Sequence, residues 1–243
     1  MAGESTSEAA SSATGRAAIS ASLSVGHRPY FSTHLLAGAQ DAARGASELE
    51  GRLVAEGVRR FSLEHRGYVL SAIVLSTAFA EAALNEVLQD AADDHVTEKI
   101  IGVSADVRRS WSGLWVGLDS GGVGRTLDRY QAALVLADAE RFDLGSEPWQ
   151  SMRLVIDLRN HLVHYKPQTV FSDTPSRLAA GLRGHVAPNP LSTNRADVDG
   201  WLSGACAGWA VDSALAFVGD FAARTAARPN YLVVLDDLRE SNP

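Results

Sequence analysis

One short segment of the chain holds the densest set of residues that could do chemistry. It reads Asp-Leu-Arg-Asn-His-Leu-Val-His-Tyr-Lys-Pro over residues 157–167. Asn160 and His164 are four residues apart and therefore share a helix face, with Arg159 at its edge. An arginine fork matches phosphate oxygens and keeps its charge, whereas a histidine titrates near neutrality and can move a proton. We interpret these three residues as a candidate catalytic set acting on a phosphodiester.

RNA is the phosphodiester for which such a set would suffice. The ribose 2′-OH is a nucleophile that the substrate itself carries, so a protein that orients it and neutralises the phosphate can cleave without a metal. Arg159 would stabilise the phosphate, His164 would act as general base or acid, and Asn160 would orient either the phosphate or the histidine. From spacing alone, the alternative is a helix end whose histidines contact the terminal carbonyl groups.

The charge around this segment is basic although the whole chain is acidic. The formal net charge is -7, yet residues 149–196 hold six basic side chains and only two acidic ones. Among them Arg153 and Lys166 flank the candidate set, and we expect both to bind substrate. Tyr165 is expected to support the site. An ordinary solvated surface is the alternative interpretation of this basic window.

Glu81 is the candidate second component of the site. It lies on the apolar stripe of a helix predicted over about 64–91. An ionised carboxylate on such a stripe needs a partner. We expect a salt bridge or hydrogen bond to Arg159 or Asn160 that orients the site. A local bond to Asn85, or solvent at the edge of the bundle, is the alternative.

Helical patterns predict the elements that would position these residues. Pro148 suits the first position of a helix and Pro167 stops one, so the candidate segment should end a helix that runs to about His164 or Tyr165. Apolar residues recur at helical spacing over 64–91 and 125–139. Further helices are expected over 35–58, after Ser104 as a cap, and from Asp197 or Asp199 to near Ala226.

The remaining segments complete an all-α prediction. Residues 171–194 hold three prolines without an apolar period and are predicted to form a long loop before the last long helix. Tyr231–Leu235 should be a short strand or a last helical turn. We see no alternation of strands and helices, so the predicted class is all-α. Residues 1–24 are predicted to be a disordered tail, and 25–243 a single helical domain with its core at about 64–226.

The candidate segment resembles the Arg-x4–6-His motif of the HEPN superfamily, in which the residue after the arginine is usually polar, as Asn160 is. Residues Ala78–Leu88 are similar to the acidic, apolar helix of that superfamily, and the helix order over Glu64–Ala226 agrees. The resemblance implies a HEPN-like helical bundle that cleaves single-stranded RNA without metal, as a homodimer bringing two motifs together. It also implies a toxin or antiphage defence setting, with room for an inhibitor or other partner protein.

Two points qualify what the resemblance implies. One toxin branch has a tyrosine two positions after the histidine, where its antitoxin adds a nucleotide, but here that position is Lys166. Other members have lost the motif and serve as binding or structural modules. The alternative function is therefore a non-catalytic helical module that binds a protein or nucleic-acid partner.

The cysteine, the tryptophans and the apolar stretches are interpreted as parts of the fold rather than of a functional site, and the histidine pair is not interpreted as a metal site. Cys206 is the only cysteine, which excludes an internal disulfide and a cysteine-based zinc site. His161 with His164 lacks a third and fourth donor at suitable spacing, so no metal or cofactor is expected. The five tryptophans are expected to fill helical cores. The apolar stretches 68–84 and 201–219 carry polar and acidic residues and are expected to be core helices, and without a signal peptide the predicted location is cytoplasmic.

Overall fold

The computed structural model describes residues 28–119, 125–167 and 174–234. Within these ranges the chain forms helices and no strand, so the all-α prediction is confirmed. The predicted tail at 1–24 lies outside the described residues. The helices are, in chain order, α1 (Ser32–Ala55), α2 (Leu63–Ala92), α3 (Ala105–Asp119), α4 (Thr126–Leu136), α5 (Trp149–Val163), α6 (Arg177–Leu182), the 3-10 helix η1 (Val198–Trp201) and α7 (Gly204–Thr225).

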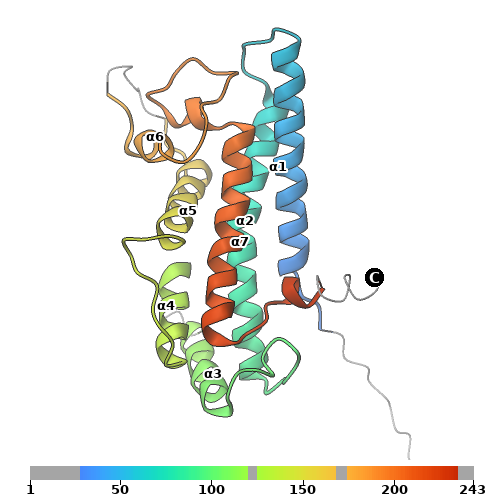
Figure 1. Cartoon of the computed structure of the whole chain (residues 1–243), viewed down its shortest axis with the longest axis vertical. Helices are drawn as coiled ribbons and strands as arrows, with labels where there is room; N and C mark the ends of the chain where they lie inside the picture. The colour runs from blue at the N-terminus through green and yellow to red at the C-terminus, as the bar shows by residue number, and fades with distance from the viewer. Residues whose placement is uncertain (1–27, 120–124, 168–173, 235–243) are drawn as a thin grey trace, which may run out of the picture.

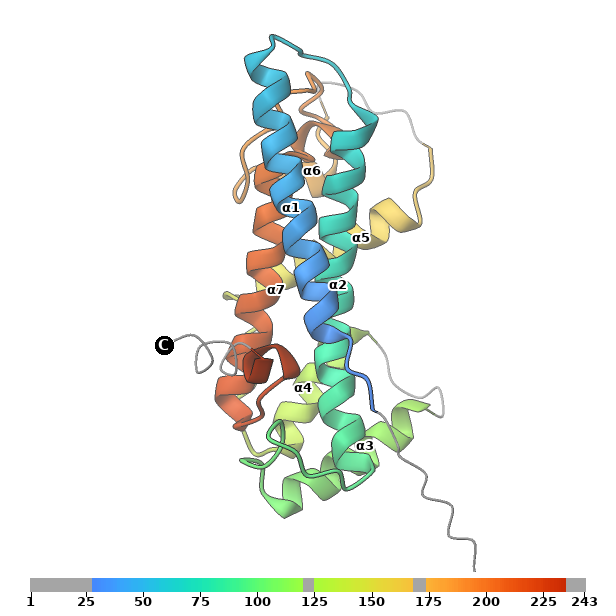
Figure 2. The same cartoon turned by 90° about the vertical axis from the view of Figure 1, so that its right-hand side faces the viewer.

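Three long helices, α1, α2 and α7, run side by side along the long axis of the molecule (Figure 1). α1 and α2 form an antiparallel hairpin, and α7 runs in the same direction as α2 (Figures 1 and 2). The shorter helices α4, α5 and α6 lie along the side of α7 that faces away from α1, with α3 at one end. The core therefore sits between the three long helices and under this second layer.

Small residues allow α1 and α7 to approach closely. α1 presents Ala39 and Ala46 to the core, and both are fully buried. At the start of α7, a Cβ added to Gly204 would lie 2.8 Å from the Cα of Ser47, so only glycine fits this contact. The backbone N–H of Gly204 donates to Oε2 of Glu50 at 2.8 Å, which gives the first turn of α7 a carboxylate from α1.

Local capping signals set several helix boundaries. Ser62 accepts a hydrogen bond from the His65 N–H and begins α2 one residue before the predicted start. Ser104 accepts from the N–H of Val107, so the predicted cap of α3 is confirmed. α7 ends before Ala226, whose φ of 56° lies in the left-handed region that closes helices. These ends agree with the predictions because the signals for them are local in sequence.

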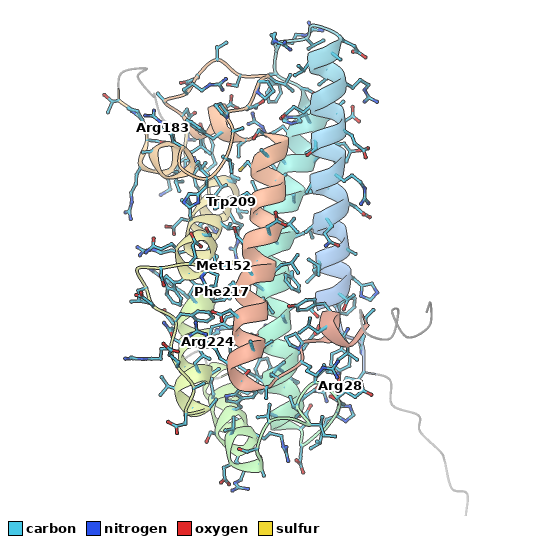
Figure 3. The ribbon with its side chains drawn as sticks, in the orientation of Figure 1. Arg28, Met152, Arg183, Trp209, Phe217 and Arg224 are labelled. Atoms are coloured by element: carbon cyan, nitrogen blue, oxygen red, sulfur yellow. The ribbon has the colours of Figure 1, made fainter. Side chains whose placement is uncertain are left out.

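Hydrogen bonds and apolar contacts join the shorter helices to the long helices and to each other. The Tyr130 hydroxyl on α4 donates to the carbonyl of Ala80 on α2 at 2.7 Å, and burial raises the pKa of Tyr130 well above its usual range. The indole of Trp111 on α3 donates to the carbonyl of Ala133 on α4 at 2.9 Å. Between α5 and α7, Met152 and Phe217 are fully buried and lie where these two helices face each other (Figure 3).

Two predictions for the C-terminal half were wrong in detail. The segment predicted to be one long loop over 171–194 contains α6, which Ser176 caps by accepting from the N–H of Ala179. The last long helix does not begin at Asp197 or Asp199. Asp197 caps η1, and α7 begins at Gly204 after Ser203 accepts from the Cys206 N–H. α6 was missed because six residues are too few for a detectable apolar period, and the start of α7 was misplaced because Asp197 caps the short helix η1 instead.

The buried core is longer than the predicted range of 64–226. Side chains of α1 from Leu36 onwards belong to it, as does Tyr231 beyond the last long helix. Residues 230–234 are helical, which matches the helical alternative for the chain end as far as it is described. The early core was underestimated because α1 contributes mainly alanines, which carry little apolar signal in a sequence.

Two of the helices, α2 and α7, are long and apolar enough to cross a membrane by length and composition. The most apolar window of α2 is 50% buried inside the bundle, and that of α7 is 56% buried. Both helices contribute side chains to the common core, including Ile73 of α2 and Val218 of α7.

Candidate functional site

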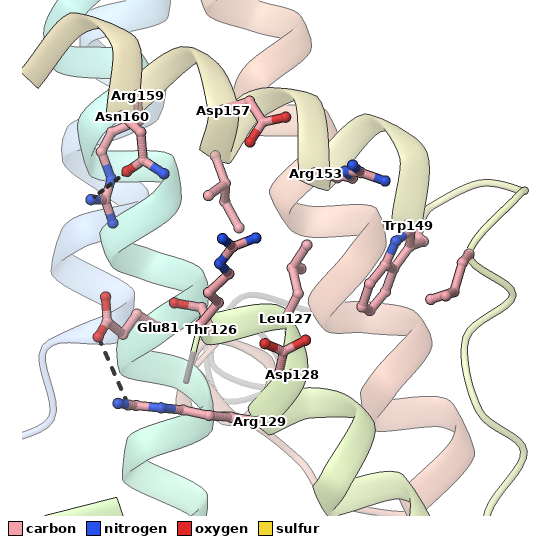
Figure 4. A pocket seen from close by; sticks show the side chains of 13 residues that line it. Glu81, Thr126, Leu127, Asp128, Arg129, Trp149, Arg153, Asp157, Arg159 and Asn160 are labelled. Atoms are coloured by element: carbon pink, nitrogen blue, oxygen red, sulfur yellow. Dashed lines mark hydrogen bonds and ion pairs between the residues drawn. The ribbon is translucent and has the colours of Figure 1, made fainter. Parts of the chain in front are cut away.

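A cleft of about 700 Å³ lies between α2, the first turn of α4 and α5. Figure 4 shows α5 on one side of it, with Arg153, Asp157, Arg159 and Asn160, and α4 on the other. Most of the lining residues are polar or charged, and a few are apolar. The lining residues are Glu81, Arg125, Thr126, Leu127, Asp128, Arg129, Leu144, Trp149, Arg153, Ile156, Asp157, Arg159 and Asn160.

The helical register of α5 explains why these side chains meet in one cleft. Trp149, Arg153, Ile156 and Asn160 are spaced by four, three and four residues and so form one stripe along the helix. The Glu147 carboxylate holds the start of α5 by accepting from the backbone N–H and the hydroxyl of Ser151. α5 ends at Val163, within two residues of the predicted end.

Arg159 is anchored in the cleft by two hydrogen bonds. Its Nε donates to Oγ1 of Thr77 on α2 at 3.3 Å, and its Nη1 donates to Oδ1 of Asn160 at 3.0 Å. Thr77 is almost fully buried, and its own hydroxyl donates to the carbonyl of Val74. Its hydroxyl oxygen is therefore fixed as an acceptor for the guanidinium. The guanidinium of Arg159 is therefore held along one edge, and the Arg159 side chain lines the cleft.

Glu81 does not have the partner that the sequence suggested. Its closest ion pair is with Arg129 on α4, where Oε1 lies 4.0 Å from Nη1 (Figure 4). The side chain of Glu81 is 41% exposed and that of Arg129 is 23% exposed. The predicted bond from Glu81 to Arg159 or Asn160 is replaced by this loose pair. The physical reason is that α4, anchored through Tyr130, brings Arg129 to Glu81, whereas Arg159 is held by Thr77.

His164 lies at the end of α5 and outside the lining of the cleft. It is the C-cap residue, its N–H donates to the carbonyl of Asn160, and its side chain is exposed. Lys166 is also exposed beyond the helix. His161 and Tyr165 lie elsewhere, with their rings in edge contact at 5.6 Å, beside a smaller cavity of about 310 Å³ near η1. Within one chain, Arg159, Asn160 and Arg153 thus share a cleft that His164 and Lys166 do not line.

Several residues of the cleft, and the residue that supports Arg159 from the core, were not singled out from the sequence. Arg125, Asp128 and Arg129 come from the first turn of α4, and Thr77 comes from the middle of α2. The charges at 125, 128 and 129 recur at helical spacing and were a usable signal for a charged helix face. Thr77 gave a weaker signal, since it is one hydroxyl on an otherwise apolar stripe.

The structural interpretations of other residues agree with their burial. Trp111, Trp149 and Trp201 are buried in the core, which confirms the prediction for these three. Cys206 is fully buried, and burial raises the pKa of its thiol to about 12. Such a thiol stays protonated and unreactive near neutral pH. Within the described ranges, no group of three or more His, Cys, Asp or Glu side chains lies close enough together to hold a metal ion.

Comparison with known proteins gives no relative: no family model, no curated protein and no solved structure matches the chain.

Proposed function

We propose that the protein is a metal-independent endoribonuclease of the HEPN type that cuts single-stranded RNA. The observation that carries the proposal is the position of Arg159. Its guanidinium is fixed by Thr77 and Asn160 at the wall of a 700 Å³ cleft, which Arg153 also lines. A pre-positioned guanidinium costs little reorganisation when charge develops on a phosphate, which is the main requirement for this chemistry.

The reaction we propose needs two proton transfers and one anchored cation. The ribose 2′-OH loses its proton to a base and forms a bond to the adjacent phosphorus, while the bond from phosphorus to the 5′ oxygen breaks and that oxygen gains a proton. The products are a 2′,3′-cyclic phosphate and a 5′-hydroxyl. Arg159 stabilises the charge on the phosphate, Asn160 holds the guanidinium through its Oδ1, and His164 transfers a proton.

Because His164 is exposed and does not line the cleft of its own chain, we propose that it acts in the cleft of a second copy of the chain. Arg159 and His164 are five residues apart, so they point about 140° apart around a helix axis. A two-fold dimer that places the α5 ends together would bring the partner's histidine to the cleft of its neighbour. The setting we propose is a cytoplasmic stress or antiphage response, which an inhibitor or other partner protein would control.

The same position of His164 favours a second candidate function. An exposed histidine that does not line the cleft of its own chain is also what a non-catalytic module would have. In that case Arg153 and Arg159 would bind the phosphates of a nucleic acid without cutting it.

Cleavage of end-labelled single-stranded RNA in excess EDTA tests the proposal. Wild type should cut, and Arg159→Ala and His164→Ala should each lose roughly 100-fold or more of the rate while keeping the helical circular-dichroism signal. His161→Ala is the matched control on the same helix and should remain close to wild type. Cutting that requires a divalent metal, or full activity of His164→Ala, would contradict the proposal. RNA binding without cutting would support the non-catalytic module instead.

A further inference from the structure

The cleft is larger than the site of one phosphate, and its other charged residues are not used by the chemistry above. Arg125 and Arg153 are exposed side chains that line it from opposite sides, one at the start of α4 and the other on α5. Arg153 and Arg159 are six residues apart, which corresponds to about 9 Å along the axis of α5. The cleft therefore offers a second cationic position at a distance from Arg159.

The net charge of the lining residues limits how much negative charge a ligand at this second position can carry. Four arginines and three carboxylates line the cleft and leave one net positive charge. Glu81 faces Arg129, so that pair contributes little net charge. Asp128 and Asp157 are exposed carboxylates that would repel a ligand carrying several adjacent phosphates. The second position can therefore take one phosphodiester, with one negative charge, separate from the phosphate at Arg159.

The cleft also has apolar lining residues. Leu127 and Ile156 line it from α4 and α5, and Leu144 adds an exposed side chain from the segment between these helices. Apolar surface between cationic side chains is what a nucleotide requires, because its base has an apolar face and its phosphate is charged. The carboxylates of Asp128 and Asp157 can accept hydrogen bonds from base amino groups or ribose hydroxyls.

From these observations we infer that the cleft holds one nucleotide of a single-stranded RNA next to the phosphate at Arg159. Arg125 and Arg153 bind the phosphate of that neighbouring nucleotide, and Leu127 and Ile156 contact its base. This inference rests on the proposed function for the identity of the strand. It adds Arg125 and the start of α4, which lie outside the motif, to the residues that bind substrate.

Binding of a non-cleavable probe tests the inference separately from catalysis. The probe is a fluorescein-labelled eight-nucleotide 2′-O-methyl RNA, titrated in EDTA at several salt concentrations. Arg125→Gln and Arg153→Gln should each weaken binding about tenfold, since a charge-assisted hydrogen bond is lost. Each variant should also reduce the slope of the logarithm of the binding constant against the logarithm of the salt concentration by roughly 0.7. Arg52→Gln is the matched control, because Arg52 is exposed on α1, away from the cleft.

The outcomes separate this inference from the proposed function. If wild type cuts RNA but both glutamine variants bind the probe like wild type, the inference is overturned and the proposed function stands. If the variants weaken binding but wild type never cuts, the cleft inference stands and the endoribonuclease proposal fails. Displacement of the probe by adenosine monophosphate at lower concentrations than by unlabelled RNA would also overturn the inference, because the cleft would then be a site for a free nucleotide.

Discussion

Arg159 on α5 donates from its Nε to the hydroxyl oxygen of Thr77 on α2, which lies 82 residues earlier in the chain. Because Thr77 is nearly inaccessible and its own proton is donated to Val74, this contact gives the guanidinium a rigid support inside the bundle. It joins the candidate motif to the longest helix of the fold. The orientation of Arg159 should therefore depend on a residue that never touches RNA.

Thr77→Val should lower the rate of RNA cleavage about tenfold, which corresponds to the loss of one hydrogen bond worth about 1–1.5 kcal/mol. Valine keeps the shape of threonine but removes the acceptor, so the fold should be retained. Thr77→Ser keeps the hydroxyl and serves as the control. The measurement is kcat/KM on a defined RNA together with a thermal melt. Equal activities of the valine and serine variants would show that the contact does not position Arg159.

Glu81→Gln should have little effect on stability. Its pair with Arg129 is loose and partly exposed, and such pairs contribute less than about 1 kcal/mol. The same change removes a negative charge from the wall of the cleft, so RNA should bind more tightly. The thermal melt and the affinity for the non-cleavable RNA probe check both effects. A large loss of stability would indicate that Glu81 is a buried, essential partner, as the sequence alone had suggested.

Gly204→Ala should destabilise the fold by about 1–3 kcal/mol through overpacking, because its new Cβ would lie 2.8 Å from the Cα of Ser47. Gly208→Ala is the matched control in the same helix. A Cβ there meets no atom within 4 Å, and alanine favours helix by up to about 1 kcal/mol. Urea unfolding of both variants measures the difference. An equal response at the two positions would mean that α1 and α7 are not in close contact at Ser47.

Mixing two inactive variants tests whether the site is shared between copies. If Arg159 of one chain works with His164 of the other, a mixed dimer of Arg159→Ala and His164→Ala contains one intact site. Random re-association should then restore about a quarter of the wild-type activity, since half of the dimers are mixed and each has one working site. Activity is measured after the two variants are unfolded together and refolded. Absence of any recovery, with each variant folded and dimeric, would place the complete site within one chain.

Much of the fold could be predicted because its signals are local. Ser104 as the cap of α3 and Pro148 before α5 mark helix starts from neighbouring residues, and the apolar period of α2 indicates where that helix runs. α6 was missed because it has six residues and buries only Ala179 and Leu182, which is too short for a detectable period. Neighbouring residues are thus enough to predict the long helices of this chain. A helix as short as α6 is stabilised by contacts with the rest of the fold, which the local sequence does not reveal.

Only those contacts of the candidate site that lie within a single helix could be predicted from the sequence. Arg159 and Asn160 are adjacent in the sequence, and the hydrogen bond between them is of this local kind. The partner of Glu81 depends on how α4 sits against α2, and that is decided by the distant contact between Tyr130 and Ala80. The spacing of residues along one helix cannot predict a contact between two helices that are far apart in the sequence. The contribution of α4 to the cleft was missed for the same reason.

The most direct test of the central claim is the role of the RNA 2′-OH as the nucleophile. Once the cut site in a single-stranded RNA is mapped, an otherwise identical RNA with a single 2′-deoxy residue on the 5′ side of that site is incubated with wild-type protein in excess EDTA. We expect the all-ribose RNA to give a 2′,3′-cyclic phosphate and a 5′-hydroxyl, and the single 2′-deoxy substitution to abolish cutting at that position alone. Undiminished cutting at the deoxy position, or cutting that stops when EDTA is added, would contradict the proposal.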